Sequence, residues 1–343
     1  MKAKRLIVSI LAIVLLLSAC GNGGSGGTTG GDGPVTFRLA SDAPIDHIAS
    51  RLNLMAVDLI YERTNGRVIV EYFPASQLGG YETVYEELIR GTIDIAQIPM
   101  PDHLDARLGV GYLPYFATNF EEAAILFGPD SFLTRYFGEI TAQHNVRFLG
   151  WLLEGFNAMG VVVDDPIDHT PGAPSEIRMR SAPMATFRFV QEDLGYNIVV
   201  VPYAEVPIAL QTGVIDAWMG PPNMNYAWGL GDLLTRMYIN YLQAEATSFV
   251  MSEQSLARLS PEDQEIVVGV FHEISAYSFI EAQADELAAR RGLAAAGVEI
   301  IEFTPQQIAE HAAFVREHTW PRLEELFGSD FMDALRAEVA NLS

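Results

Sequence analysis

Between residues 177 and 221 the hydrophobic and polar positions alternate between a strand pattern and a helix pattern. Pro183 suits the first position of a helix, where its missing N–H is not needed, and Gly195 suits the left-handed residue that ends one. Ile198–Val201 is a continuous β-branched run, typical of a strand buried on both faces. We expect strands over 177–181, 198–201 and 214–219, and helices over 183–194 and 204–212. This alternation predicts a parallel sheet with crossover helices, in which ligands bind beyond the carboxyl ends of the strands.

The rest of the chain from residue 35 shows the same mixture of short strands and helices. We expect strands over 35–40, 68–73, 147–152 and 298–303, one beginning near 95, and helices over 48–63, 80–89, 119–127 and 304–342. The segments Gly91–Asp94 and Gly213–Asp216 share the pattern G-x-x-D, and each follows a predicted helix and opens a strand. Two lobes built on similar plans would produce this repetition, although so short a motif also arises by coincidence.

The longest predicted element is a helix that begins at Pro261. Ser260 is a suitable N-cap, and Asp263 lies at the third helical position. No strong breaker occurs before Gly297, so about 36 residues at 1.5 Å each would give a helix of roughly 54 Å, longer than one small lobe. A coiled-coil arm is the alternative. Against it, the apolar positions drift instead of holding a heptad; they are Ile266, Val270, Phe271, Ile274, Tyr277 and Phe279.

The first 34 residues predict a leader and a tether. Three basic residues precede an uncharged apolar run over 6–17 that is too short to span a membrane, so 1–19 is expected to be a signal peptide. The residues Leu-Ser-Ala-Cys that end at Cys20 resemble a bacterial lipobox, in which the cysteine is lipidated and becomes the mature N-terminus. An ordinary signal peptide with a chance cysteine is the alternative. Residues 20–34 are mostly glycine and predict a flexible tether.

Composition and charge narrow the classes of function. About half of the residues are hydrophobic and a fifth are charged, and the roughly 310 residues after the tether suffice for two lobes. The formal net charge is −23, and removing the three basic residues of the leader takes it to −26. So acidic a surface repels nucleic acid and anionic lipid headgroups. An anionic ligand is still allowed, because one arginine in a cleft outweighs distant, screened charges.

The motifs of common enzymes and metal sites are missing from the sequence. The seven histidines show no H-E-x-x-H pattern, and His311 and His318 have no third partner at a suitable spacing. No nucleophile elbow occurs outside the glycine tether. Cys20 is the only cysteine, so it forms no disulfide within the chain and supplies no usable nucleophile. The adjacent Asp164 and Asp165 fall in an expected solvated loop. We therefore expect no enzyme activity, no cofactor and no metal.

Several motifs in a fixed order resemble the solute-binding proteins of TRAP (tripartite ATP-independent periplasmic) transporters. They are R-M-R-S-A-P from Arg178, P-Y-A-E-V-P-I-A-L-Q-T-G-V-I-D-A from Pro202, T-N-G-R-V from Thr64, F-P-A-S-Q-L-G from Phe73, G-T-I-D from Gly91 and Y-L-P-Y-F from Tyr112. The resemblance implies a two-lobe α/β fold of the periplasmic-binding-protein type, with a long helix spanning both lobes. It assigns 35–157 and 246–287 to lobe I, and 158–245 and 288–343 to lobe II.

The same resemblance implies the function and the main binding residue. Members capture a small organic acid by hinge closure and pass it to integral-membrane subunits driven by an ion gradient. Arg180 falls on the family's carboxylate-binding arginine, and a guanidinium offers two parallel donors that match a carboxylate. A structural salt bridge is the alternative role. We expect Arg178, two residues away, to point to the opposite face of the strand, so that only one of the pair faces the cleft, and we choose Arg180 on its place in the motif.

Two departures from the family pattern concern the ligand. Where members read G-F-R, this chain has Gly155-Phe156-Asn157, so a neutral amide replaces a second arginine. This change disfavours a dicarboxylate or a bulky sugar acid as the ligand and remains compatible with a monocarboxylate. Gly220 stands where many members have an asparagine that faces the ligand, and Asn223 or Asn225 are candidates to replace it. The segment that begins at Trp218 resembles, at a shifted spacing, one found in members that bind 2-keto or 2-hydroxy acids.

The remaining candidates each have a plain structural alternative. Phe156 and Trp218 could wall the pocket or pack in the core, and Tyr203 is divided between the same two roles. Further candidates at the ends of lobe I strands are Ser41, Asp42 and Gln97, while Glu205 is expected to cap its helix or brace Arg180. We expect a receptor in the periplasm or on the outer face of the cytoplasmic membrane, tethered through Cys20. The rival functions are a ligand-binding input for a membrane sensor and a secreted enzyme.

Overall fold

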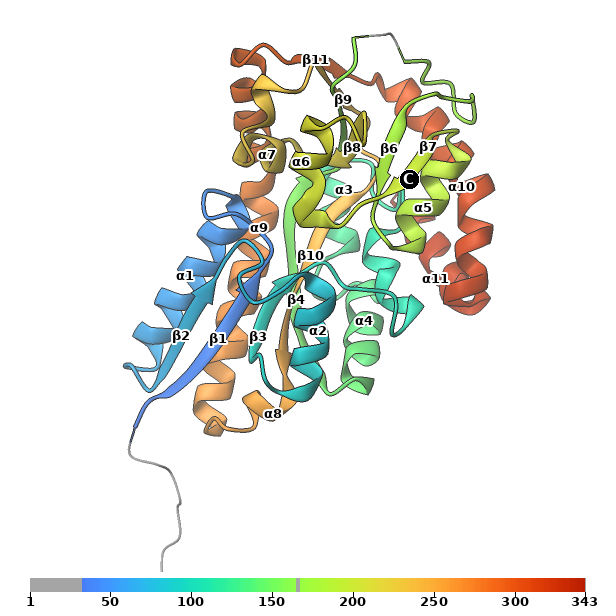
Figure 1. Ribbon diagram of the computed structural model, residues 1–343. Helices are drawn as coiled ribbons and strands as arrows, with labels where there is room; N and C mark the ends of the chain where they lie inside the picture. Colours follow the sequence, from blue (N-terminus) through green and yellow to red (C-terminus); the bar gives the residue numbers. More distant parts are fainter. Residues whose placement is uncertain (1–32, 165–166, 343) are drawn as a thin grey trace, which may run out of the picture. The chain divides into compact units, whose positions relative to one another are not determined.

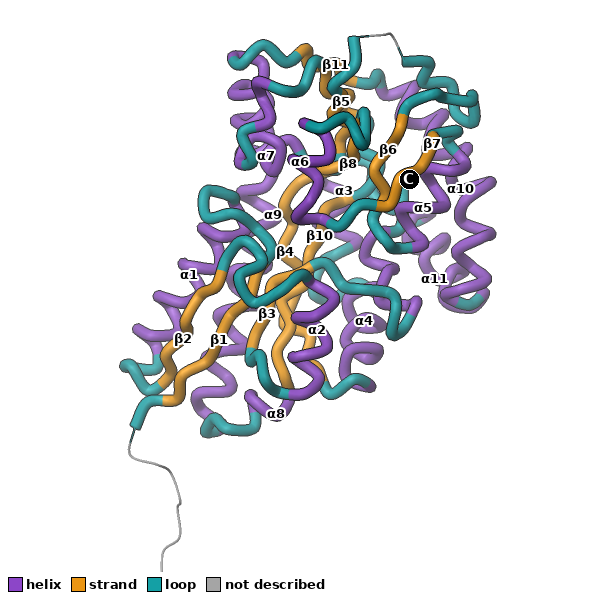
Figure 2. The backbone as a smooth tube through the Cα atoms, in the orientation of Figure 1, coloured by secondary structure: helices purple, strands orange, loops and turns teal. Residues whose placement is uncertain are grey.

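The computed structural model describes residues 33–164 and 167–342. The predicted signal peptide, Cys20 and nearly all of the glycine tether lie outside the described residues, as does Asp165. The described residues from 34 onward belong to one compact unit, drawn in Figure 1. This unit contains two separate sheets, which are visible as the two groups of orange strands in Figure 2.

The first sheet contains five strands in the order β2-β1-β3-β10-β4. Their bounds are β1 Val35–Ser41, β2 Val68–Phe73, β3 Ile95–Ile98, β4 Val146–Phe156 and β10 Ala244–Ser252. The strands β1, β2 and β3 are parallel, and β10 runs antiparallel between β3 and β4. We call the part of the fold around this sheet lobe I. Its other elements are α1 Ile48–Arg63, α2 Tyr81–Arg90, η1 Ala106–Tyr112, α3 Phe120–Leu126, α4 Phe132–Gln143 and α8 Glu253–Leu256.

The second sheet contains six strands in the order β11-β9-β5-β8-β6-β7. They are β5 Ala158–Val161, β6 Arg178–Ser181, β7 Asn197–Val200, β8 Ala217–Gly220, β9 Arg236–Ile239 and β11 Glu299–Glu302. The strand β6 is parallel to both β7 and β8, as predicted, whereas β5 is antiparallel to β8 and β9. We call the part around this sheet lobe II. It also holds α5 Ala185–Asp193, η2 Tyr203–Glu205, α6 Val206–Gln211, α7 Pro222–Ala227 and η3 Leu230–Asp232.

The chain passes between the two sheets at three places in the described residues. It crosses at Asn157, between β4 and β5, and returns over 240–243, between β9 and β10. The strand β10 begins at Ala244, two residues before the predicted return to lobe I. The third passage is the helix α9 Pro261–Ala295, which has 35 residues.

The predicted long helix is present, and its packing explains how one element serves both lobes. Ser260 is its N-cap, with the hydroxyl oxygen accepting from the Asp263 N–H at 3.1 Å. Val270 and Ile274 pack in a core cluster with β1, α1 and β4, whereas Leu293, near the other end, packs in the cluster around β8 and α7. The single helix therefore buries one end in lobe I and the other in lobe II (Figure 1).

The two C-terminal helices, α10 Pro305–Phe327 and α11 Ser329–Ala340, contact elements of both lobes. Helix α10 packs against α5 and η1, and α11 packs against α4. Trp320 donates from its indole nitrogen to the Pro114 carbonyl at 2.9 Å, and Arg316 donates to the Tyr115 carbonyl. The C-terminal segment thus joins lobe II to the predicted Y-L-P-Y-F segment of lobe I.

The repeated G-x-x-D motif has the same role in each sheet. Asp94 accepts a hydrogen bond from the backbone N–H of Arg38 in β1 at 2.8 Å. Asp216 accepts one from the backbone N–H of Arg178 in β6 at 2.9 Å. Each carboxylate therefore ties the turn that precedes a strand to the neighbouring parallel strand, which supports the interpretation that the two lobes share a local plan.

Three details of the predicted elements are wrong. The strand β7 lies at the edge of its sheet instead of being buried on both faces, and Val200 is 58 % exposed. Helix α5 begins at Ala185 with Met184 as its N-cap, so Pro183 precedes the helix. The strand β8 begins only at Ala217, because residues 213–216 form the turn that Asp216 fastens to β6. None of the described helices combines the length and apolar character needed to cross a membrane.

Candidate functional site

Two small adjoining cavities lie where the strand ends of the two lobes meet. One, of about 30 Å³, is lined by side chains that include Arg180, Tyr112, Trp218 and Gly220. The other, of about 10 Å³, is lined by side chains that include Asp42, Gln97, Glu154 and Thr247. Both are bounded by Pro99, Tyr203 and Glu245. A wider pocket of about 390 Å³ shares Asp42, Tyr81 and Tyr203 with them.

Arg180 is the cation of the first cavity. It stands near the carboxyl end of β6 and is only 4 % exposed. Its Nε donates to the Val201 carbonyl at 3.0 Å, and the guanidinium carbon lies 5.9 Å from the centre of the Tyr203 ring. Within the described part of the chain it forms no salt bridge, and its two terminal nitrogens have no hydrogen-bond partner. Burial lowers the pKa of this guanidinium, but an arginine still remains charged.

Arg178, on the same strand, has a different environment. Its guanidinium forms two hydrogen bonds with the Asp216 carboxylate, at 2.8 and 2.5 Å. The side chain of Arg178 is partly exposed. The expectation that the two arginines point to opposite faces is wrong, because a spacing of two residues places Arg178 and Arg180 on the same side of β6. They differ in position, since Arg178 lies at the start of the strand and Arg180 near its end. Of the two, Arg180 therefore lines the cavity.

Glu245 is an acidic residue of this site that the sequence reasoning missed. Its Oε1 accepts from the Tyr112 hydroxyl at 2.9 Å. The side chain of Asn157 lies beside the same carboxyl, yet neither its amide nitrogen nor its amide oxygen has a well-formed hydrogen bond. Burial raises the pKa of Glu245 to about 7, against the opposing effects of Tyr112, Asn157 and Arg180.

Glu154 is the second missed acid, and it belongs to a buried network. Its Oε1 accepts from Gln97 Nε2 at 3.0 Å and from Thr247 Oγ1 at 2.9 Å. Its Oε2 lies 3.8 Å from His47 Nε2. Burial raises the pKa of Glu154 well above its ordinary value, and the Glu245 carboxyl acts in the same direction.

Asp42, a predicted candidate, completes the acidic wall. Its Oδ1 accepts from the Ser76 hydroxyl at 2.9 Å, while its Oδ2 is buried without a partner. Burial raises the pKa of Asp42 to about 6. Gln97, also predicted, serves as a positioning residue, because its Oε1 accepts from Ser41 at 2.7 Å while its Nε2 holds Glu154.

Trp218 explains why residue 220 is glycine. The indole of Trp218 lies over Gly220, where an added Cβ would fall 2.1 Å from Trp218 Cη2. The Trp218 Nε1 donates to Asn225 Oδ1 at 2.8 Å, which fixes the orientation of the ring. Because this bond occupies the Asn225 amide oxygen, that oxygen is not free to contact a ligand. Tyr203 and Trp218 both pack on Trp228, with ring centres 5.0 Å apart in each pair.

Phe156 and Asn223 lie outside the cavity walls. Phe156 packs in the core against Phe120 and Tyr241, at 5.1 and 5.2 Å between ring centres. Asn223 connects the lobes instead, because its Oδ1 lies 3.2 Å from His47 Nε2 and its Nδ2 donates to the Glu154 carbonyl at 2.5 Å. Glu205 is exposed on η2, and its side chain caps no helix.

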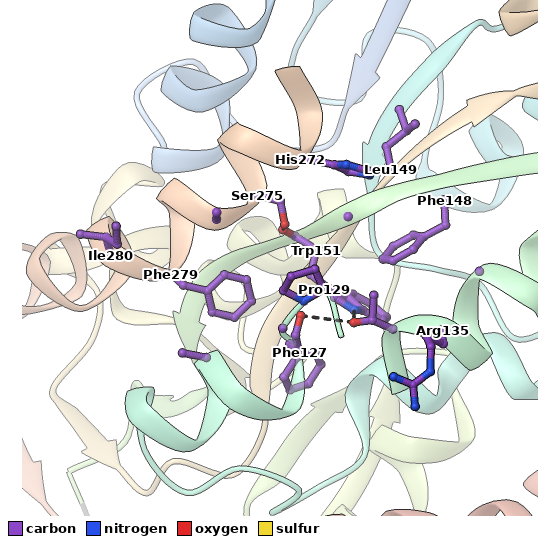
Figure 3. Close-up of a pocket in the computed structure, with 16 residues that line it drawn as sticks. Phe127, Pro129, Arg135, Phe148, Leu149, Trp151, His272, Ser275, Phe279 and Ile280 are labelled. Carbon is purple, nitrogen blue, oxygen red and sulfur yellow. Dashed lines mark hydrogen bonds between the residues drawn. The ribbon is translucent and has the colours of Figure 1, made fainter. Parts of the chain in front are cut away.

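A larger pocket, of about 550 Å³, lies elsewhere, between α3, α4, β4 and α9. Figure 3 shows the rings of Phe127, Phe148 and Phe279 around it. Arg135 is on its rim and is exposed. This apolar pocket therefore has no buried charge directed into it, unlike the cavity that holds Arg180. No group of three side chains in the described ranges is arranged to bind a metal ion.

Comparison with known proteins now identifies the family. Residues 42–322 match the family model described as bacterial extracellular solute-binding protein, family 7. The chain belongs to this family. The predicted resemblance is confirmed, and with it the class of protein, an extracytoplasmic solute-binding receptor. Among curated relatives, a protein of Salmonella typhimurium known as uncharacterized protein YiiZ is 26 % identical, over 68 % of this chain and 71 % of its own length. A solute-binding protein of Albidiferax ferrireducens is 21 % identical, over 76 % and 77 %.

Solved structures confirm the predicted two-lobe α/β fold for this solute-binding protein. The sugar acid binding protein DctPAm of Advenella mimigardefordensis, in complex with galactonate, superposes with a TM-score of 0.82 at 17 % identity, over 91 % of this chain and 99 % of that one. DctP7, a Bordetella pertussis extracytoplasmic solute receptor binding pyroglutamic acid, gives 0.80 at 16 % identity, over 89 % and 99 %. At these identities the likeness concerns the fold alone.

Proposed function

We propose that this protein is the extracytoplasmic receptor of a TRAP transporter, which captures a small organic acid between its lobes and delivers it to integral-membrane subunits. One observation carries the proposal: the buried Arg180 guanidinium lines a cavity between the lobes and forms no salt bridge within the described residues, although the Glu245 carboxyl borders the same cavity. A buried cation without a partner is costly, so an anionic ligand is the natural complement. TRAP solute-binding proteins of the same fold have been solved with malonate and succinate bound.

Capture by hinge closure is supported by the contacts between the lobes. The carboxylate of Asp102, in lobe I, accepts from the Ala185 N–H at the start of α5 in lobe II at 2.9 Å. His47 and Asn223 form a second such contact. Because the inner cavities are small, a ligand enters only when contacts of this kind break and the lobes separate.

Calorimetry with two matched arginine variants tests the proposal. A panel of monocarboxylates, dicarboxylates, keto acids and sugar acids is first screened by thermal shift. For an acid that binds, Arg180→Ala is expected to weaken affinity by at least about 100-fold, roughly 2.7 kcal/mol. Arg178 lies on the same strand as Arg180. The change Arg178→Ala removes its partly exposed ion pair with Asp216 and should leave ligand affinity unchanged. Unchanged binding in Arg180→Ala, with the fold intact by circular dichroism, would refute the assignment.

Two finer parts of the proposal have their own tests. We place the protein in the periplasm or on the outer face of the cytoplasmic membrane, held by lipid on Cys20. Cys20→Ser should then move the protein from the membrane fraction to the soluble fraction. The protein acts by binding alone, so every acid that binds should be recovered chemically unchanged after prolonged incubation. If the protein serves transport, uptake of that acid by cells should depend both on this protein and on membrane transport subunits. If it serves a sensor, uptake should not depend on this protein.

A further inference from the structure

The charges around the two cavities are unbalanced. One cation, Arg180, lines the first cavity, whereas the carboxyl groups of Asp42, Glu154 and Glu245 line the second. The Glu245 side chain borders both cavities and so stands between the cation and the other two acids. The site is therefore polarised, with a positive end in lobe II and an acidic end formed mainly by residues of lobe I.

The polar atoms that lack partners follow the same polarity. At the positive end, the terminal nitrogens of Arg180 are donors without an acceptor. At the acidic end, Asp42 Oδ2 is a buried acceptor without a well-formed hydrogen bond, although the Tyr81 backbone N–H lies near this carboxyl. Between them, the amide of Asn157 lies beside the Glu245 carboxyl, but neither its nitrogen nor its oxygen has a well-formed hydrogen bond. Buried polar groups are normally satisfied, so these orphaned atoms indicate what a ligand would supply: an anion at one end, and hydrogen-bond donors at the other.

Glu154 differs from the other two acids. Its Oε1 already accepts from Gln97 and Thr247, and both bonds hold the carboxyl in place. We therefore assign Glu154 a background electrostatic role and assign direct contact to Glu245 and to Asp42.

Two simpler ligand classes fit this polarity poorly. A dicarboxylate would place its second anion against the acidic end, where Asp42 and Glu245 would have to stay protonated to avoid like-charge repulsion. A monocarboxylate without donors would satisfy Arg180 but supply no hydrogen bond to Asp42 Oδ2 or to the Asn157 amide, and buried polar groups that lack good hydrogen bonds are costly. A cationic nitrogen removes both costs, because an ammonium carries three donors and neutralises the acidic end.

We propose that the ligand of this site is a small zwitterion, whose carboxylate binds Arg180 and whose cationic nitrogen binds Glu245 and Asp42. This inference rests on the proposed function, since it names the class of acid that the same site would hold. Asn157, beside Glu245, then contributes a neutral amide that tolerates the cation.

The test uses pairs of acids that differ only in one group, which is an ammonium in one acid and a hydroxyl in the other. Each pair sets an amino acid against the hydroxy acid of the same skeleton: glycine with glycolate, alanine with lactate, β-alanine with 3-hydroxypropionate, and γ-aminobutyrate with 4-hydroxybutyrate. Succinate is the dicarboxylate probe. In calorimetry on the full mature chain, at least one amino acid is expected to bind 10-fold or more tightly than its hydroxy partner and than succinate.

Variants separate this inference from the proposed function. Glu245→Gln keeps the shape of the side chain and an acceptor for Tyr112. It should lower the affinity for the favoured amino acid at least 10-fold, while the affinity for the hydroxy acid stays unchanged or rises. Glu205→Gln, an exposed acid nearby, is the matched control and should change neither. If hydroxy acids or succinate bind most tightly, and Arg180→Ala weakens their binding while Glu245→Gln does not, the zwitterion inference is wrong. The proposed receptor function would then still hold. Binding that ignores Arg180→Ala would overturn both.

Discussion

His47 of lobe I and Asn223 of lobe II are joined by a buried hydrogen bond of 3.2 Å between Nε2 and Oδ1. The Nδ1 atom of His47 accepts from the Ala49 N–H at the start of α1, so Nε2 carries the proton and donates to the asparagine. Burial lowers the pKa of His47 to about 4, which keeps the ring neutral near pH 7. The amide nitrogen of Asn223 donates to the Glu154 carbonyl and to Asp285 Oδ2 on α9. One amide thus links α1, β4, α7 and α9.

We predict that Asn223→Ala favours the open arrangement of the lobes. The change leaves the His47 N–H and the Glu154 carbonyl without partners in the closed form, at about 1–3 kcal/mol per group. Ligand affinity should fall at least about 5-fold, because the binding-competent form becomes less populated. Small-angle scattering of the ligand-free variant should show a larger radius of gyration than the wild type.

Asn197→Ala is the matched control for this prediction. Asn197 is an exposed residue of the edge strand β7, so its loss should alter neither affinity nor the scattering curve. A variant at position 223 that binds as tightly as the wild type and scatters identically would show that this hydrogen bond does not govern closure.

The contact between Trp218 and Gly220 gives a prediction for the binding wall. Gly220→Ala places a Cβ against the indole, and the collision is expected to lower the free energy of unfolding by about 1–3 kcal/mol and ligand affinity by about 10-fold. The smaller ring of Trp218→Phe should relieve much of this cost, so that the two changes show coupling of about 0.5–3 kcal/mol in a double-mutant cycle by chemical denaturation. Additive effects would contradict the steric explanation.

Arg180→Lys separates the shape of the guanidinium from its charge. Lysine keeps the positive charge but loses the planar pair of donors and the bond from Nε to the Val201 carbonyl. Affinity for a carboxylate is expected to fall at least about 10-fold, or 1.4 kcal/mol, yet less than in Arg180→Ala. Calorimetry on the three proteins measures both steps. A lysine variant that binds as tightly as the wild type would show that charge alone holds the ligand.

Much of the fold could be predicted because its signals are local. Helix α1 occupies the predicted residues, and α9 begins at its predicted cap, since capping residues and breakers act within a few positions. The errors concern neighbours in space. The run Ile198–Val201 indicates a strand but not its place at the edge of the sheet, because that place depends on which strands pair with it.

The site could be predicted only in part for the same reason. The position of Arg180 in a motif pointed to the cavity, whereas Phe156 and Asn223, from equally suggestive motifs, lie in the core and between the lobes. Glu154 and Glu245 were missed, although each is a lone acid in an otherwise apolar strand segment, W-L-L-E-G-F and A-E-A-T-S-F-V-M. Such an acid is a signal of a buried polar role, but its partners Gln97, Thr247 and Tyr112 come from distant parts of the chain.

The buried acids lead to a prediction about pH. Burial raises the pKa of Glu245 to about 7, above the value of an unfolded glutamate. Between about pH 4.5 and 7 the folded protein therefore binds more protons than the unfolded chain, and stability falls as pH rises through this window. Asp42 and Glu154 act in the same sense, whereas His47, whose pKa is lowered, acts in the opposite sense. The net slope is thus a sum of opposing contributions.

Glu245→Gln removes one of these contributions and also takes away the charge that raises the pKa of Glu154. Glutamine does not titrate, so the stability of the variant relative to wild type should rise from pH 5 to pH 8, on the order of 2–3 kcal/mol for a shift of this size. The groups that face Glu245 are the Tyr112 hydroxyl, the Asn157 amide, Arg180 and Glu154, and all remain in the variant. Denaturation curves of both proteins without ligand, at pH 5, 6, 7 and 8, measure the difference. A difference that stays constant over this range would show that the Glu245 carboxyl is ionised throughout in the folded protein, because a constant difference requires the folded and unfolded states to bind equal numbers of protons at this residue and the unfolded glutamate is already largely ionised.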